Sequence, residues 1–341
     1  MDTCDHAVVQ TLLEAHAPST RKLYAGRWRL FSVWCRDQQV DPVRCPVPIL
    51  LRYLQTLLDK GLSPSTLGVY IAAISARHVL VDGRTVGSHR LVCRYLKGAV
   101  RTRPPRVARV PSWDLPLVLE AMCSPPFEPL ERADLKWLSV KTAFLLAITS
   151  AKRVGELHAL SVARGCVRWT SDGSDVTMWP NPIFLPKRLS AFHVNQPVKL
   201  SAYTPQTAGG LQPDASLLCP VRALRRYIDV TSEFRRSDAL FLCYGGDRKG
   251  CALSKQRLSH WIVDAVLQAY KLRGLPAPPV RCHSTRGVST SWAALKGVPL
   301  MDICAAATWA SPCTFARFYR VNVAAHHQVA TAVLSASSAC D

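Results

Sequence analysis

The chain reads Arg281-Cys282-His283-Ser284-Thr285-Arg286 close to its carboxyl end, and Thr314-Phe315-Ala316-Arg317-Phe318-Tyr319 a little further on. Residues three positions apart share one face of a helix, so His283 and Arg286 are expected to lie side by side. Trp309 lies between the two segments. An imidazole, a guanidinium, an indole and a phenol together form a set suited to gripping and attacking a phosphodiester.

A second arginine opens an amphipathic segment well upstream, in Ser150-Ala151-Lys152-Arg153-Val154-Gly155-Glu156-Leu157. Attack by a tyrosine on a phosphodiester passes through a state that carries more negative charge than the ground state. Two arginines can hold its non-bridging oxygens bidentately and so stabilise this charge as it develops. Arg153 and Arg286 fit that role. Glu156 follows Arg153 by three residues, a spacing that places both on one helical face.

Proton transfer needs further groups. Lys187 is the candidate for protonating the departing 5′ oxygen, because this task needs an ammonium on a flexible stem. Lys152 and Lys199 compete with it for this role. His283 is expected to transfer protons or to hydrogen-bond the phosphate. Trp309 can only donate a hydrogen bond, since an indole has no acceptor.

Tyr319 is the candidate nucleophile. A phenol with a pKa near ~10 needs nearby cations or a base to react at neutral pH, and the arginines would provide the cations. The sequence shows no P-loop, no carboxylate cluster suited to Mg²⁺ and no Cys/His zinc spacing. No metal and no cofactor are therefore predicted.

The composition predicts a nucleic-acid partner. The 341 residues carry 43 Lys+Arg against 23 Asp+Glu, a net charge of +20, and a polyanion is the simplest partner for such an excess. Residues 1–110 hold 17 Lys+Arg and 7 Asp+Glu, so half of the excess falls in about a third of the chain. The 13 cysteines are odd in number and irregularly spaced, which favours reduced thiols. Neither a signal peptide nor a membrane-spanning stretch is visible, so no membrane partner is expected.

The first part of the chain reads as helices at 18–37, 48–58, from 63 onward and at 88–102. The buried face of the first is expected to come from Leu23, Trp28, Phe31, Val33 and Trp34. The fourth carries a row of cations at helical spacing, named here the basic stripe, that either is solvated or faces phosphates; it consists of Arg90, Arg94, Lys97 and Arg101. Arg103 and Arg106 extend this charge into a proline-stiffened linker at 104–111.

The second part reads as helices near 114–123 and 134–149, another helix opened by Arg153, and helices at about 219–233 and 254–273. Between them lie β-rich pieces at 166–169, 176–179 and 196–200. The predicted fold class is therefore mainly α, with a small antiparallel β-sheet in the second domain.

The series Arg153, Lys187, His283 with Arg286, Trp309 and Tyr319 resembles the catalytic set of the tyrosine recombinase (phage integrase) family. The sequences of residues 150–157, 219–224 and 314–319 resemble those of the recombinases encoded by DIRS- and Ngaro-like retrotransposons. The resemblance extends from about residue 18 to residue 323. In the family the proton-donating lysine sits on a β-hairpin, which favours Lys187. Glu156 either resembles the family's acidic partner that orients the arginine or is a charge on a helix surface.

This resemblance implies a two-domain organisation. It assigns an N-terminal extension at 1–17, a helical SAM-like core-binding domain at 18–103 that clamps DNA, the linker at 104–111, an α+β catalytic domain at 112–323 and a C-terminal tail at 324–341. The implied activity is DNA cleavage and religation through a 3′-phosphotyrosyl intermediate, without ATP, metal or cofactor. Its implied use is site-specific recombination and integration of mobile-element DNA in the nucleus. The implied partners are double-stranded DNA and further copies of the chain, as a tetramer on DNA.

One feature departs from the family pattern. The usual spacing from the His/Trp position places the nucleophile at Phe318, one residue before Tyr319. A shift of one residue turns a helical side chain by about 100°, so either the start of the last helix or the alignment of Trp309 differs. Two alternatives stay open: a catalytically inactive or domesticated DNA-binding copy, and a type IB topoisomerase-like enzyme that shares the chemistry but relaxes supercoils.

Overall fold

The computed structural model describes residues 5–105, 111–203 and 217–323, and the chain divides into two compact units, 1–107 and 108–341. Each unit is described by itself below. Arg106 and the predicted tail at 324–341 lie outside the described residues. Within the described part, no helix combines the length and the apolar character that crossing a bilayer requires.

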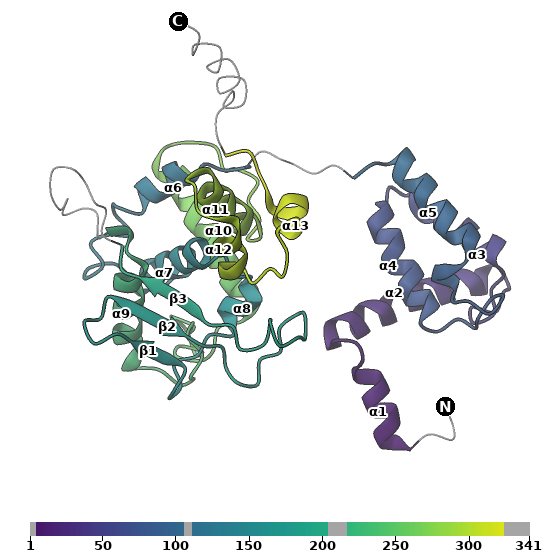
Figure 1. Cartoon of the computed structure of the whole chain (residues 1–341), viewed down its shortest axis with the longest axis horizontal. Helices are drawn as coiled ribbons and strands as arrows, with labels where there is room; N and C mark the ends of the chain where they lie inside the picture. The colour runs from purple at the N-terminus through teal and green to yellow at the C-terminus, as the bar shows by residue number, and fades with distance from the viewer. Residues whose placement is uncertain (1–4, 106–110, 204–216, 324–341) are drawn as a thin grey trace, which may run out of the picture. The chain divides into compact units, whose positions relative to one another are not determined.

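The first unit is helical, as Figure 1 shows. Its elements are α1 (His6–Glu14), α2 (Pro18–Asp37), α3 (Val47–Asp59), α4 (Pro64–Ser75), the short 3₁₀ turn η1 (Val86–Ser88) and α5 (Arg90–Thr102). Prolines in the first turns of α2, α3 and α4 fix the backbone where no intrahelical N–H is needed. The core includes Phe31, Leu50, Leu54, Leu67 and Ile74, all fully buried.

The predicted face of α2 is wrong in part. Phe31 is buried and Trp28 and Trp34 pack against the core, but Leu23 and Val33 are 43% and 46% exposed. Cys35, four residues after Phe31, takes the inward position instead, because side chains four apart stack on one helical face.

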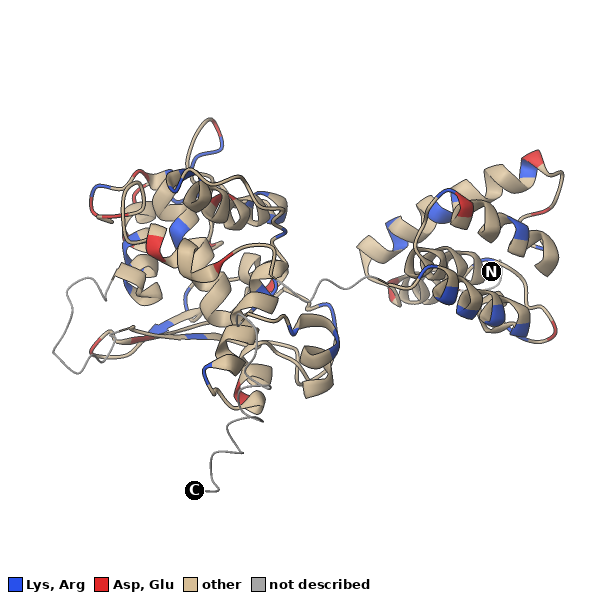
Figure 2. Cartoon of the chain, turned by 90° about the horizontal axis from the view of Figure 1, so that it is seen from above, with Lys and Arg blue, Asp and Glu red and all other residues tan. Residues whose placement is uncertain are grey.

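The basic stripe lies on the solvent side of α5. Val92 and Ala99 are the buried residues of this helix, whereas all four stripe residues and Arg103 are exposed. Among the described ion pairs, none involves these five cations. Figure 2 shows how Lys and Arg are distributed over the unit. The stripe is therefore available to an external anion.

The second unit joins many helices to one small sheet. Its helices are α6 (Leu115–Ala121), α7 (Leu135–Ser150), α8 (Val154–His158), α9 (Pro220–Ser232), α10 (Lys255–Leu272), α11 (Ser284–Leu295), α12 (Leu300–Ala306) and α13 (Pro312–Thr314), followed by the π-helical turn η3 (Phe315–Tyr319). Strands β1 (Val167–Trp169), β2 (Asp175–Met178) and β3 (Val198–Ser201) form an antiparallel sheet in the order β1-β2-β3, with Val176 opposite Trp169 and Leu200. The predicted fold class, mainly α with a small antiparallel sheet, is confirmed.

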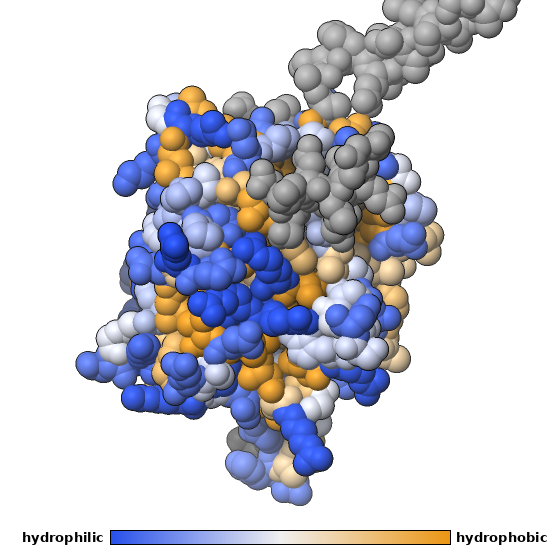
Figure 3. Space-filling view, turned by 90° about the vertical axis from the view of Figure 1, so that its left-hand side faces the viewer, coloured by the Kyte–Doolittle hydropathy of each residue, from blue (hydrophilic) through white to orange (hydrophobic). Residues whose placement is uncertain are grey.

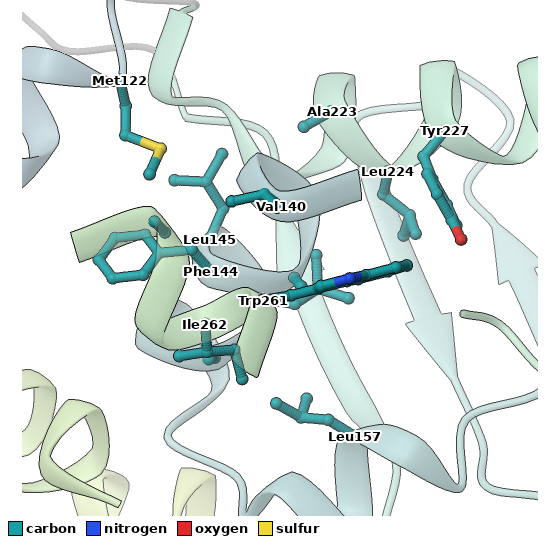
Figure 4. Packing of buried hydrophobic residues seen from close by; sticks show 14 of the residues in the cluster. Met122, Val140, Phe144, Leu145, Leu157, Ala223, Leu224, Tyr227, Trp261 and Ile262 are labelled. Carbon is teal, nitrogen blue, oxygen red and sulfur yellow. The ribbon is translucent and has the colours of Figure 1, made fainter. Parts of the chain in front are cut away.

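Helix α7 forms the centre of this unit. It is apolar around most of its circumference, and it packs against α9, α10, α11 and β3. Figure 4 shows Val140, Phe144 and Leu145 of α7 beside Trp261 and Ile262 of α10. A helix that is apolar around most of its circumference is typical of a buried position in the core.

A buried charge network also holds α7. Lys141 is fully buried and donates hydrogen bonds to Glu128 Oε1 at 2.5 Å and to the Met122 carbonyl at 2.7 Å. Arg222 of α9 binds the same carboxylate with two nitrogens, at 2.8 and 3.1 Å. A buried ion is tolerated when partners satisfy it in this way. Figure 3 shows one face of the molecule, on which hydrophilic and apolar side chains are mixed.

Candidate active site

Arg153 enters the site directly after α7. The helix ends at Ala151 in a left-handed conformation, with φ of 50°, which turns the chain sharply toward α8. The carboxylate of Glu156 binds both the backbone and the side chain of Arg153. One oxygen accepts the backbone N–H of Arg153 at 2.8 Å, and the other accepts from its Nη1 at 3.0 Å. Both hydrogen bonds pair Glu156 with Arg153, which is the arrangement expected of a partner that orients the arginine.

Arg286 lies in the first turn of α11 and is only 2% exposed. Its Nη2 donates to the Ala307 carbonyl, while Nε and Nη1 are buried without a partner. Its guanidinium carbon lies 4.8 Å from the centre of the Trp309 ring and 5.1 Å from that of Tyr319. Burial, and the charge of Arg153 after it, lower the pKa of Arg286 to about 10. A buried cation with unpaired N–H groups and no carboxylate needs an anion from outside.

Trp309 is 3% exposed, and its Nε1 is also buried without a partner. Five buried side-chain nitrogens or oxygens among the described residues have no hydrogen-bond partner, and three of them belong to Arg286 and Trp309. Unpaired buried donors are uncommon in proteins. Their concentration at one place indicates a site for a ligand with several acceptor oxygens.

The π-helical turn accounts for the position of Tyr319. In η3 the N–H of Arg320 bonds the carbonyl of Phe315, a span of five residues instead of four, at 2.9 Å. Such a turn takes up one extra residue in a helix and is frequent at functional sites. The Tyr319 ring has its centre 4.7 Å from that of the Trp309 ring. Phe318 is 71% exposed.

The backbone of Tyr319 is fixed against α11. A Cβ atom on Gly287 would meet the Tyr319 carbonyl oxygen at 3.0 Å, so glycine permits this close approach. Ser291, one turn further, offers its hydroxyl to the same carbonyl at 3.4 Å and accepts from the N–H of Val321 at 2.9 Å. The turn that carries Tyr319 is thus attached to the helix that carries Arg286.

Arg153, His283 and Tyr319 line one cleft of about 750 Å³, together with Arg188 and Thr314. Burial first, and then nearby cations led by Lys255, lower the pKa of His283 below its usual 6.5. The imidazole is therefore neutral at pH 7 and able to accept a proton.

The three lysines named from the sequence occupy different places. Lys187 is exposed in the connection between β2 and β3, and its charge reaches His283. Lys199 is exposed on β3. Lys152 is 7% exposed and lies beside both arginines. The resemblance-based choice of Lys187 is neither excluded nor singled out by these positions.

Two cations were missed by sequence reasoning. Arg188 lines the cleft with Tyr319, and Lys255, at the start of α10, lies near Gly155 and acts on the pKa of His283. Arg188 is adjacent to the lysine of the β2–β3 connection, which was a usable signal. Lys255 follows a capped helix start, Ser254, which gave no indication of a site.

Several solved structures of recombinases and integrases share this fold. A lambda integrase dimer bound to a core site matches with a TM-score of 0.54 over 95% of this chain and 79% of that chain, at 13% identity. The Tn1549 transposon integrase in complex with transposon right end DNA matches with a TM-score of 0.53 over 98% of each chain, at 14% identity. No protein-family model matches the chain, and no curated protein matches its sequence. At such low identity the likeness defines the fold.

Proposed function

We propose that this chain cleaves and rejoins DNA strands as a tyrosine recombinase, with Tyr319 as the nucleophile. The observation that carries the proposal is the group of unpaired buried donors on Arg286 and Trp309, directly against the Tyr319 ring. Arg286 lines a small cavity with Arg153 and His283, and these two residues also line the cleft that holds Tyr319. A phosphate that enters this cavity from the cleft would meet the unpaired Arg286 donors. The fold shared with integrases supports the same reading.

In this mechanism Arg153 and Arg286 bind the non-bridging oxygens of the scissile phosphate, and Trp309 Nε1 donates a further hydrogen bond. The neutral imidazole of His283 takes the phenolic proton as the Tyr319 oxygen attacks phosphorus. The bond from phosphorus to the 5′ oxygen breaks, and an ammonium protonates that oxygen; the resemblance assigns this step to Lys187. The 3′-phosphotyrosyl ester keeps the bond energy, so the reverse attack rejoins the strand.

The finer parts of the proposal concern substrate and assembly. The basic stripe and Arg103 would contact phosphates of double-stranded DNA, which explains their exposure without ion pairs. The resemblance to retrotransposon-encoded recombinases supports integration of mobile-element DNA in the nucleus. The lambda integrase match is a dimer on its DNA, and further copies of this chain are expected to assemble on two duplexes as a tetramer.

The test uses duplexes drawn from the DNA that flanks the gene, nicked a few bases beyond each candidate cleavage site. Cleavage next to a nick releases a short fragment and leaves the protein covalently attached to DNA. Wild-type protein should form this adduct, and Tyr319→Phe should lose it while its DNA affinity stays nearly unchanged. Tyr203→Phe, which removes an exposed hydroxyl elsewhere, is the matched control and should retain it.

The two alternatives give other outcomes. A DNA-binding copy without activity would bind these duplexes and form no adduct with any variant. A topoisomerase-like enzyme would form the adduct and relax a supercoiled plasmid that carries one site, without exchanging strands between two sites. Strand exchange between two sites that depends on Tyr319 is the result expected of a recombinase.

A further inference from the structure

Phe318 is the most exposed aromatic side chain of the described residues, at 71%. It directly precedes Tyr319, the proposed nucleophile, and both side chains line the same cleft. Phe315 lies three residues earlier, a spacing that would place both phenylalanines on one face of an α-helix. Phe315, however, is 6% exposed and packs against Trp309, with 5.9 Å between the ring centres. The turn thus buries one phenylalanine and presents the other at the cleft that holds the nucleophile.

Packing within the unit does not account for the position of Phe318. Of the ring–ring and cation–ring contacts within the described part of the chain, none involves this side chain. A single exposed apolar residue is ordinary on a protein surface. This one, however, lines the cleft of the proposed reaction, so a ligand that enters the cleft would meet its ring.

The lining of the cleft combines two kinds of side chain. Arg153, Arg188 and His283 are cationic or polar, whereas Phe318 and Val321 are apolar. The volume of about 750 Å³ falls in the range of pockets that hold ligands much larger than a phosphate. A nucleotide matches both kinds of lining, because it joins an anionic phosphate to a flat aromatic base.

The chemistry of cleavage decides which nucleotide stays beside Phe318. Attack by Tyr319 keeps one nucleotide attached through its 3′ phosphate, whereas the strand end with the 5′ hydroxyl is released. Phe318 and Tyr319 are adjacent, with Cα atoms about 3.8 Å apart, so Phe318 lies next to the retained nucleotide. When the 5′ end leaves, the retained base loses its stacking neighbour on that side. An aromatic side chain can replace this neighbour.

We propose that Phe318 stacks on the base of the nucleotide whose 3′ phosphate is bonded to Tyr319. This inference rests on the proposed function and adds a DNA contact at the same cleft. The ring holds the cleaved end in place until a 5′ hydroxyl attacks the phosphotyrosyl ester. Every base has an aromatic face, so such stacking tolerates any sequence. Phe318 therefore positions the DNA end without selecting a base.

The test compares two nicked duplexes, one with the natural base at the retained nucleotide and one that is abasic there. The protein is first trapped as the covalent adduct. A strand with a 5′ hydroxyl is then added, and the rate of rejoining is measured. Phe318→Ala should rejoin the natural duplex about 5–150-fold more slowly than wild type, the equivalent of one stacked base. On the abasic duplex the two proteins should rejoin at equal rates, because the contact is already missing.

Three further variants separate stacking from other effects. Phe318→Trp keeps an aromatic face and should rejoin the natural duplex near the wild-type rate. Phe318→Leu keeps apolar bulk without that face and should be as slow as Phe318→Ala. Tyr203→Ala removes an exposed aromatic ring that does not line the cleft, and it should keep the full difference between the two duplexes. Because the side chain at position 318 is exposed, its variants should keep the wild-type Tm.

The proposal is overturned if Phe318→Ala rejoins the natural duplex at the wild-type rate, or if it is slowed equally on both duplexes. It is also overturned if Phe318→Leu matches wild type, because an apolar contact alone, such as one with a second copy of the chain, would then suffice. In each of these cases wild-type protein still forms the adduct, so the proposed function stands. If wild type forms no adduct on the natural duplex, the proposed function fails and this inference fails with it.

Discussion

Replacing Arg286 by methionine should stabilise the free protein while it abolishes activity. The guanidinium is 2% exposed and has two unpaired nitrogens. The lowering of its pKa from 12.5 to about 10 corresponds to a cost of about 3 kcal/mol for keeping it charged in the folded state. Stacking on Trp309 and Tyr319 returns about 1 kcal/mol. The net gain on substitution is therefore about 2 kcal/mol, or about 4–8 °C in Tm for a unit of this size.

Thermal unfolding of wild type and Arg286→Met at pH 7 measures this directly. Inorganic phosphate should raise the Tm of wild type and leave that of the variant unchanged, because only wild type has the unpaired Arg286 N–H groups that bind an anion. Arg222→Met is the matched control: this guanidinium binds Glu128 bidentately, so its loss should lower the Tm. A clear drop in Tm for Arg286→Met would mean that the guanidinium stabilises the empty site, which would refute the reasoning.

Three further predictions concern geometry, pH and salt. Exchanging Phe318 and Tyr319 should abolish the covalent adduct, because the π-helical turn directs position 318 to solvent; an active exchange variant would show that the turn does not select the nucleophile. In a pH–rate profile, the loss of cleavage rate on the acid side should occur below pH 6.5, since the pKa of His283 is lowered. Lys255→Met should move this loss to higher pH, because it removes one of the cations that lower the pKa of His283. An unchanged profile would argue against His283 as the base. Arg94→Gln in the basic stripe should reduce the slope of log affinity against log salt by about 1 with no effect on cleavage at saturating DNA, and an unchanged slope would exclude a phosphate contact there.

The helices and strands of this chain could be predicted because their signals are local. Prolines at the start of α2, α3 and α4 and the serine cap at Ser63 mark helix starts independently of tertiary contacts. The alternation of β2, with Val176 and Met178 buried, marks a strand in the same way. The buried face of α2 was harder, because its neighbours decide which of several apolar residues point inward.

The candidate site was predictable in its members but not in its geometry. The residue types and their order pointed to Arg153, His283, Arg286, Trp309 and Tyr319 as one set. The π-helical turn at 315–319 packs on α11, and no residue of this segment predicts such a turn from the sequence alone. Lys152 is buried and donates to Thr308, whose backbone has a φ of 53°; both features come from tertiary packing, which local sequence patterns do not show.

The central claim is that the Tyr319 oxygen bonds to DNA, and peptide mapping of the trapped complex tests it most directly. Trypsin cuts after Arg317 and Arg320, so the attached nucleotide should appear on the tripeptide Phe318-Tyr319-Arg320. Fragmentation of that peptide should place the added mass on the tyrosine. A nucleotide found on any other peptide would contradict the account.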